Sequence, residues 1–274
     1  MTNITSKVVS HYNMQGIGNR ILSALKDEGI DINSLTPNIL TPIDQFHTRG
    51  IRATKDLANI VTPTASMHLL DVGCGIGGTA RYLASTYGCQ VTGIDLTNEY
   101  IEAASMLTEL CHLDNLVNFR QANALNLPFN DNSFDMVWCQ NVAMNIEDKN
   151  SLYREIARVI ISEGYFISTE MSADKNSSPY FPLPWARSPE ISFLISQKEM
   201  LTKLKNSGLK VIESKDTSLN AIKAFNTMVK TQPHNRLSLS LIAGEDIDVR
   251  VANVRQSLIE RRIFNVTIAA KKQM

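Results

Sequence analysis

The sequence has no excess of charge of one sign and no long hydrophobic run. Its 274 residues include 27 Lys and Arg and 27 Asp and Glu, so the formal net charge at neutral pH is zero. Binding to nucleic-acid phosphates needs a basic excess or a basic stripe, so nucleic acid is not an expected partner. No apolar run reaches the ~18 residues of a membrane-spanning helix, and the first residues lack the pattern of a signal peptide. We therefore expect a cytoplasmic protein without a membrane span.

Cysteine is scarce too, and the common hydrolase motifs are missing. The four cysteines form no CxxC pair and the five histidines are scattered, so no metal site is expected. We expect the cysteines to be reduced thiols. GxSxG, HExxH and GxxxxGK(S/T) are all absent, which argues against serine hydrolases, zinc proteases and P-loop nucleotidases.

From about residue 67, short β-rich segments alternate with segments of helical periodicity. This alternation is typical of a parallel sheet with crossover helices. Segments such as MHLLDV and FDMVW are apolar throughout, as expected of strands that are buried on both faces. We therefore expect an α/β fold with a Rossmann-like, seven-stranded, mostly parallel sheet and flanking helices. The predicted strands are 67–72, 90–94, 117–122, 134–139, 164–170, 210–215 and 264–270.

Two segments lie outside this alternation. Residues 1–62 are predicted to form an N-terminal helical lid, with a turn-rich loop at 34–50 because this stretch contains two prolines. The second segment, at about 219–261, precedes the last strand and is predicted to be a helical cap over the carboxyl edge of the sheet. Its last helix has acidic residues at its start and arginines at its end, as the helix dipole favours. Residues 63–274, with this cap inserted, are expected to form the main domain.

The strongest functional signal is the segment LLDVGCGIGGTARYLA at 69–84. An apolar strand leads directly into four glycines and then into a helix. Glycine permits positive φ and lets a ligand approach the backbone closely, and the start of the helix offers free N–H groups. The same letters satisfy GxGxxG, so this motif alone does not separate a nicotinamide cofactor from other adenosine cofactors.

Two further segments follow in the expected order. Asp95 ends the second predicted strand, where a carboxylate can accept hydrogen bonds from ribose hydroxyls, and Leu96 is placed to cover one face of a purine. After the third strand, the segment NALNLPF at 123–129 is followed by DNSFDMVWCQ at 131–140.

Taken together, these motifs resemble the class I S-adenosylmethionine-dependent methyltransferases. The resemblance extends over about residues 45–170 and is closest to small-molecule enzymes of the sarcosine/dimethylglycine, phosphoethanolamine and quinone- or sterol-methylating kind. It implies that the chain uses S-adenosylmethionine as cofactor and methylates a nucleophilic N, O or C atom of a small-molecule acceptor. The alternatives are a nicotinamide-dependent oxidoreductase and a non-catalytic scaffold that binds S-adenosylmethionine. The sequence does not define an oligomeric state.

The resemblance also implies which residues bind the cofactor. Asp71 and the glycine loop would hold the methionine portion, with Gln140 beside it. Asn123 stands where the family usually has Asp, and its amide oxygen can still accept a hydrogen bond from the adenine amino group. The complete implied set is Asp71, Gly73, Cys74, Gly75, Gly77, Asp95, Leu96, Asn123, Ala124, Leu125 and Gln140.

The acceptor is expected at the carboxyl ends of the strands, where ligands bind in open parallel sheets. His47 is a candidate for orienting the acceptor or for acting as a base near neutral pH; the alternative is an ordinary loop histidine bonded to backbone. Asn145 occupies the position of a histidine base in phosphoethanolamine-type relatives. An amide cannot take a proton, so either the base lies elsewhere, or the nucleophile arrives unprotonated, or Asn145 merely caps the next helix.

The segment 177–194 after the fifth strand is rich in proline and aromatic residues. Tyr180 and Trp185 are candidates for the wall of a hydrophobic or cationic acceptor site; the alternative is ordinary packing of a lid. Methyl transfer from a sulfonium requires no proton at the carbon, so positioning and the exclusion of water can supply much of the catalysis.

Overall fold

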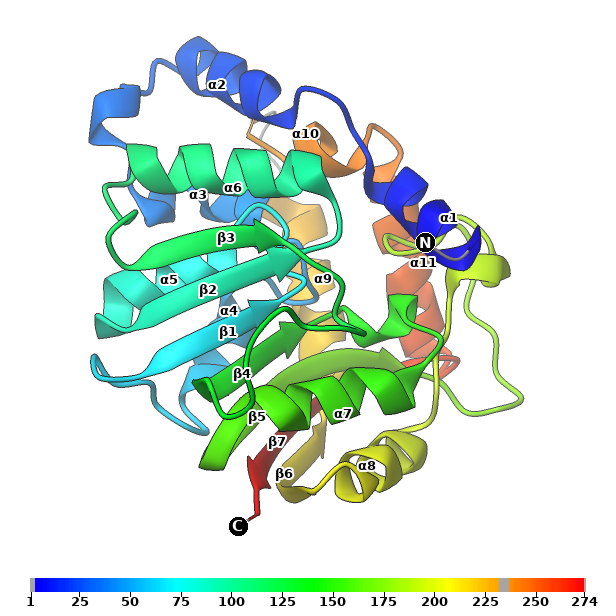
Figure 1. The fold of residues 1–274 in the computed structure, drawn as a ribbon. Helices are drawn as coiled ribbons and strands as arrows, with labels where there is room; N and C mark the ends of the chain where they lie inside the picture. Colours follow the sequence, from blue (N-terminus) through cyan, green and yellow to red (C-terminus); the bar gives the residue numbers. More distant parts are fainter. Residues whose placement is uncertain (1–2, 232–236, 274) are drawn as a thin grey trace.

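Seven strands form one sheet at the centre of the molecule, with helices on both faces (Figure 1). The computed structural model describes residues 3–231 and 237–273. The strand order is β3-β2-β1-β4-β5-β7-β6; β7 is antiparallel to both neighbours and the other neighbouring pairs are parallel. The strands are β1 (His68–Val72), β2 (Gln90–Asp95), β3 (Val117–Gln121), β4 (Phe134–Gln140), β5 (Ile160–Ser172), β6 (Leu209–Asp216) and β7 (Phe264–Lys272). The predicted Rossmann-like, mostly parallel sheet is confirmed.

One strand differs clearly from its predicted range. The sequence predicts a strand over 164–170, whereas β5 already begins at Ile160. The pairing of β5 with β4 shifts in register between Phe134 and Met136. At the same place in β5, Glu163 adopts a left-handed φ of 64°. This bulge interrupts the alternation of side chains by which a strand is recognised in a sequence.

Eleven α-helices surround the sheet in the described part of the chain, most of them in layers on its two faces (Figure 1). They are α1 (Asn3–Tyr12), α2 (Ile17–Asp27), α3 (Pro37–Asp44), α4 (Ile51–Ala58), α5 (Gly78–Tyr87), α6 (Asn98–Leu110), α7 (Lys149–Val159), α8 (Gln197–Asn206), α9 (Ser218–Thr231), α10 (Ser240–Ala243) and α11 (Ile247–Ile259). In β1, Leu70 and Val72 belong to the core shared with α7 and α8, whereas Leu69 belongs to the core shared with α4 and α5. Successive strand residues point to opposite faces, so the apolar run of β1 is buried on both sides.

The loop predicted at 34–50 contains a helix, α3, so this prediction is wrong in part. Pro37 lies in the first turn of α3, where backbone N–H groups have no acceptor within the helix, so its missing N–H costs no hydrogen bond. Leu40 and Ile43 are fully buried, and α3 packs on α5. Pro42 lies inside the helix. The burial of apolar side chains outweighs the helix-breaking tendency of this proline, which by itself predicts a loop.

The segment between β6 and β7 is helical, as predicted for the cap. It contains α9, α10 and α11, while its residues 232–236 lie outside the described part of the chain. The cap and α1 lie at the carboxyl edge of the sheet and line the same cavity (Figure 1). The domain boundary at residue 62 stays a prediction. Within the described residues, no helix combines the length and the apolar character that crossing a bilayer requires.

Candidate active site

A cavity of about 710 Å³ opens at the carboxyl ends of β1, β2 and β4. Its walls come from the loops after these strands, from the N-terminal helices and from the cap. This volume lies in the usual range for small-molecule sites. The sequence-predicted cofactor residues that line it are Asp71, Gly73, Cys74, Gly75, Asp95, Leu96, Asn123, Ala124, Leu125 and Gln140.

The glycine loop after β1 exposes its backbone to the cavity at one point. Gly73 and Gly75 have left-handed φ angles of 70° and 53°. A Cβ on Gly73 would lie 2.4 Å from Val142 Cγ2, whereas a Cβ on Gly75 would meet no atom within 4 Å. The loop is fixed to β2 because the N–H groups of Gly73 and Cys74 donate to Ile94 O at 2.8 and 2.9 Å. A ligand can therefore approach the backbone closely at Gly75.

Gly77 does not line the cavity, in contrast to the prediction. It precedes α5 with a φ of 84°. A Cβ at this position would lie 2.5 Å from the Phe119 ring and 2.8 Å from Arg81 Nη1. Gly77 is thus required for close packing beneath the loop, and its assignment to the cofactor is not supported.

The Asp95 carboxylate, at the end of β2, already joins two loops. Its Oδ1 accepts a hydrogen bond from Thr97 N at 2.9 Å, and its Oδ2 accepts one from Gly75 N at 3.1 Å. Each carboxylate oxygen can accept a second hydrogen bond, so both remain available to hydroxyl groups of a ligand. Burial raises the pKa of this carboxyl group. Leu96 follows directly and lines the cavity.

Asp71, near the end of β1, carries an unsatisfied acceptor. The residue is 3% exposed, and its buried Oδ2 has no hydrogen-bond partner among the described residues. Burial, the larger cause, and the charge of Asp95 together raise the pKa of the Asp71 carboxyl to about 7. A buried carboxylate oxygen without a partner is costly. The site therefore suits a ligand group that donates a hydrogen bond or carries positive charge.

Gln140, at the end of β4, carries an unsatisfied donor. Three donors converge on its Oε1: Trp138 Nε1 at 2.6 Å, Thr54 Oγ1 at 3.2 Å and Thr79 Oγ1 at 3.3 Å. They fix the orientation of the amide and leave Nε2 buried without a partner in the described part of the chain. Because β1 and β4 are neighbours, with Asp71 opposite Trp138, the unpaired donor and the unpaired acceptor lie at the same end of the cavity.

His47 lines the cavity with one ring nitrogen engaged. Its Nε2 lies 3.1 Å from Gly50 O and 3.1 Å from Thr54 Oγ1. A carbonyl oxygen only accepts, so Nε2 carries the proton and Nδ1 carries the lone pair. No hydrogen bond from the described residues reaches Nδ1. Burial lowers the pKa of His47 to about 4, so the ring is neutral at physiological pH.

Asn145 also lines the cavity, and both of its polar atoms are paired. Tyr12 of α1 donates its hydroxyl to Asn145 Oδ1 at 2.9 Å, and Asn145 Nδ2 donates to Trp185 O at 2.8 Å. Asn145 does not cap the next helix, because Asp148 caps α7. Its side chain instead links the N-terminal helix to the loop after β5.

The aromatic loop contributes one ring to the cavity rather than several. Tyr180 lies outside the cavity, which contradicts the prediction: it is 36% exposed, its hydroxyl donates to Glu260 at 2.7 Å, and Arg262 lies 4.2 Å above its ring. Trp185 is buried, lines the cavity and donates from Nε1 to Ser192 Oγ at 3.0 Å. The ion pair that Arg262 forms with Glu260 keeps Tyr180 on the surface.

Comparison with known proteins agrees with this geometry. Residues 70–168 match the family described as methyltransferase domain. The chain is 34% identical over 134 residues to a sarcosine/dimethylglycine N-methyltransferase from Halorhodospira halochloris (48% of this chain, 47% of the relative). It is 31% identical over 183 residues to an O-methyltransferase from Penicillium expansum (65% of this chain, 66% of the relative). A solved structure of geranyl diphosphate C-methyltransferase from Streptomyces coelicolor has a TM-score of 0.72 at 16% identity and covers 99% of both chains.

The chain belongs to the class I S-adenosylmethionine-dependent methyltransferases. The matched family segment contains the glycine loop, Asp95 and the LPF turn, which we define as residues 123–129. The matches to these two curated relatives span about half and about two thirds of the relatives' own lengths.

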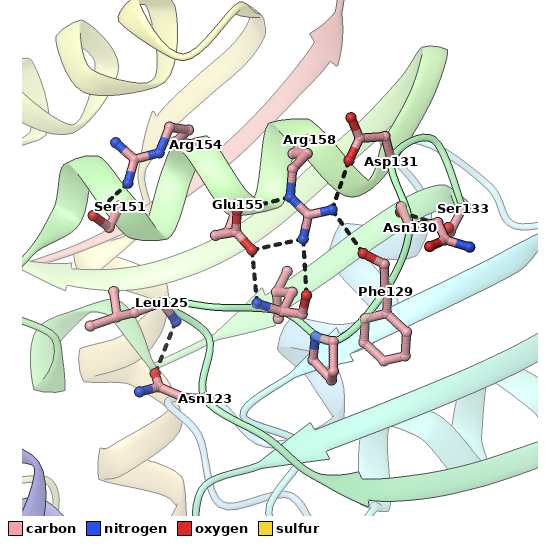
Figure 2. Close-up of polar contacts among 12 residues, drawn as sticks. Asn123, Leu125, Phe129, Asn130, Asp131, Ser133, Ser151, Arg154, Glu155 and Arg158 are labelled. Carbon is pink, nitrogen blue, oxygen red and sulfur yellow. Dashed lines mark hydrogen bonds and ion pairs between the residues drawn. The ribbon is translucent and has the colours of Figure 1, made fainter. Parts of the chain in front are cut away.

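A turn clamp, which we define as Glu155 and Arg158 of α7, holds the LPF turn (Figure 2). Glu155 Oε2 accepts from Leu127 N at 2.8 Å, and Arg158 Nη2 donates to Leu127 O at 2.9 Å. Arg158 Nη1 also donates to Phe129 O at 2.8 Å, and the two clamp side chains are bonded to each other at 2.8 Å. Because the clamp binds backbone atoms of the turn, it fixes the path of the turn independently of the side chains that the turn carries.

Asn123, at the start of the turn, is partly committed within it. Its Oδ1 accepts from Leu125 N at 2.9 Å (Figure 2). The amide oxygen that the sequence analysis offers to a ligand thus already supports the turn, although it retains a second lone pair. Ala124 and Leu125 line the cavity beside it.

Replacing Arg158 with glutamine is expected to weaken binding of S-adenosylhomocysteine about 10-fold, since the turn loses several charge-assisted bonds. Calorimetric titration measures the loss. The matched control is Arg154→Gln one turn away on α7, because Arg154 is exposed and, among the residues that the structure describes, donates only to Ser151 Oγ (Figure 2). Equal affinities of the two variants would show that the clamp does not position the turn.

Proposed function

We propose that this chain transfers a methyl group from S-adenosylmethionine to a nucleophilic atom of a small molecule. The observation that carries the proposal is the pair of buried, unpaired atoms Asp71 Oδ2 and Gln140 Nε2 beside the glycine loop. An unpaired acceptor and an unpaired donor on neighbouring strands suit the ammonium and carboxylate groups of an amino acid. When bound, S-adenosylmethionine supplies a sulfonium methyl group that reacts with nucleophiles.

Other residues of the cavity suit the ribose and the adenine of S-adenosylmethionine. The second lone pairs of Asp95 suit the two ribose hydroxyls. Leu96, Ala124 and Leu125 provide an apolar slot of the kind that an adenine ring occupies. Gly75 leaves open space at the backbone where the chain of a ligand can pass. The protein's part in the reaction is to align the two substrates and to exclude water under α1 and the cap.

Four free cysteines, all buried, suit the reducing cytoplasm that we propose as the compartment. Within the described residues, no group of three potential metal-ligating side chains is found. The proposed reaction needs none, because the leaving group is already positively charged.

The proposal is tested by incubating the protein with S-adenosylmethionine labelled in its methyl group and a metabolite extract. Mass spectrometry then identifies compounds that gain the label, with Asp95→Ala as the control for transfer without the enzyme. We expect labelled compounds that form only with the wild-type protein. Binding of S-adenosylhomocysteine without transfer to any compound would favour the non-catalytic scaffold.

The affinity for S-adenosylhomocysteine is expected to rise with pH through about 7, the pKa of the Asp71 carboxyl. The ligand's ammonium group prefers ionised Asp71, so affinity increases up to about 10-fold per pH unit below this pKa and levels off above it. Without ligand the sign is opposite. Because the pKa of the Asp71 carboxyl is raised in the folded state, the protein's free energy of unfolding decreases as the pH rises toward about 7. Titrations between mildly acidic and mildly alkaline buffer measure the slope. Asp71→Asn should remove it, and an equal slope in this variant would exclude Asp71 as the source.

A further inference from the structure

The half of the cavity away from Asp71 is apolar. Its wall combines side chains from α1, the loop after α3, the loop after β4, the loop after β5 and the cap. The apolar residues among them include Val8, Phe46, Met144, Trp185, Phe225 and Val254. Apolar lining with a few polar groups is what holds a largely apolar ligand.

The charged side chains at this end are not available to a buried ligand. Arg52, Glu147 and Asp148 are exposed, and Arg49 is ion-paired with Asp56. A carboxylate or phosphate on the acceptor would therefore enter a largely apolar wall whose one largely buried cation among the described residues, Arg49, is already paired with Asp56, and this burial is unfavourable. Amino-acid and phosphoethanolamine acceptors, which carry such groups, fit this wall poorly.

His47 lies where the two halves of the cavity meet. Thr54 Oγ1 contacts both His47 Nε2, at 3.1 Å, and Gln140 Oε1, at 3.2 Å. Through Thr54, the imidazole is thus tied to the residue that carries the unpaired donor of the cofactor end. The bond from Nε2 to Gly50 O fixes the tautomer and leaves Nδ1 as the free acceptor in the cavity wall.

We propose that the acceptor is an uncharged, largely apolar molecule with a hydroxyl nucleophile, and that His47 Nδ1 takes the proton of that hydroxyl. This inference rests on the proposed function. As the bond between the hydroxyl oxygen and the methyl carbon forms, the carbon–sulfur bond breaks and its electron pair stays on sulfur. The hydroxyl becomes strongly acidic as its oxygen gains the methyl group, so its proton passes to Nδ1 although burial lowers the pKa of His47 to about 4. The imidazolium then returns the proton to water when the product leaves.

The acceptor class is tested by calorimetry in two steps. A titration with S-adenosylhomocysteine first shows that this ligand binds, and the acceptor probes are then titrated into the saturated protein. The probes are 1-naphthol and a chromanol as apolar phenols, and sarcosine, dimethylglycine and phosphoethanolamine as charged acceptors. We expect the phenols to bind and the charged acceptors not to bind.

Val8→Asp should weaken phenol binding about 10-fold or more, while Val249→Asp, on the exposed side of α11, should not change it. Failure of both phenols to bind, or binding of the charged acceptors, overturns the proposal. Absence of binding by S-adenosylhomocysteine itself would instead contradict the proposed function.

The role of His47 is tested with two phenols that differ in acidity, in mildly alkaline buffer. 1-Naphthol keeps its proton there, whereas its 4-nitro derivative is already ionised. His47→Ala should reduce the methylation rate of 1-naphthol about 100-fold or more and leave that of the nitro derivative nearly unchanged. Added imidazole should restore part of the lost rate. Equal losses with both phenols, or no loss with 1-naphthol, would show that His47 takes no proton. Unchanged affinity for S-adenosylhomocysteine excludes a general loss of structure.

Discussion

Replacing Gly78 with alanine is expected to destabilise the protein by at least about 3 kcal/mol, because a methyl group has no space at this position. A Cβ on Gly78 would lie 2.1 Å from the carbonyl oxygen of Asp44 and 2.6 Å from its Cγ. Gly78 has an ordinary helical φ, so the whole effect is steric. Asp44 cannot move aside easily: it is buried and its Oδ2 accepts from Arg81 Nη2 at 2.9 Å, with both side chains almost fully buried.

Urea unfolding followed by circular dichroism measures the loss. The matched control is Gly208→Ala, where the φ is +88° but no atom lies within 4 Å of the added Cβ. That variant should lose only the cost of the left-handed backbone, about 1 kcal/mol. If Gly78→Ala were no less stable than Gly208→Ala, the close packing of α3 on α5 would be wrong.

Asp95→Ala is expected to weaken binding of S-adenosylhomocysteine by at least about 100-fold. Two hydroxyl bonds to a charged carboxylate are lost, each contributing about 1.5–3 kcal/mol. The same change also removes the acceptors of Gly75 N and Thr97 N, which loosens the glycine loop and adds to the loss. Calorimetric titration measures the affinity, and an unfolding curve shows how much of the effect is structural.

Glu99→Ala provides the comparison for this variant. Glu99 lies close to Asp95 in the sequence and accepts from Gly16 N at 3.3 Å, but it does not line the cavity. It should bind S-adenosylhomocysteine with nearly wild-type affinity. A wild-type affinity in Asp95→Ala as well would remove Asp95 from the binding site.

The sheet was predictable because most of its strands have a strong local pattern. β1 and β4 are buried on two faces and read as continuous apolar runs, and turns with glycine or polar residues separate them from the helices. The predictions fail where packing between distant segments determines the secondary structure. α3 forms despite its prolines because α5 covers its apolar face, and β5 contains a bulge that interrupts its pattern.

The sequence also predicted which residues gather at the end of the cavity that contains Asp71, since they follow directly from strand ends. Gly77 is the exception: only the position of the Phe119 ring shows that its role is packing. That the gathered residues bind the cofactor stays a prediction. Tyr180 could not be placed from the sequence, because its partner Glu260 is far away in the chain.

The acceptor end and the turn clamp are assembled from distant segments. Val8, Trp185 and Phe225 meet only in the folded chain. Glu155 and Arg158 look like an ordinary exposed pair three residues apart on a helix. Their role depends on the backbone of the LPF turn, which no local pattern indicates.

The most direct test of the central claim is a thermal unfolding titration with three ligands: S-adenosylmethionine, S-adenosylhomocysteine and a nicotinamide dinucleotide. A ligand that binds only the folded state raises the unfolding temperature in proportion to its occupancy. The account predicts a rise with both sulfur-containing nucleosides and none with the dinucleotide. Stabilisation by the dinucleotide alone would contradict it.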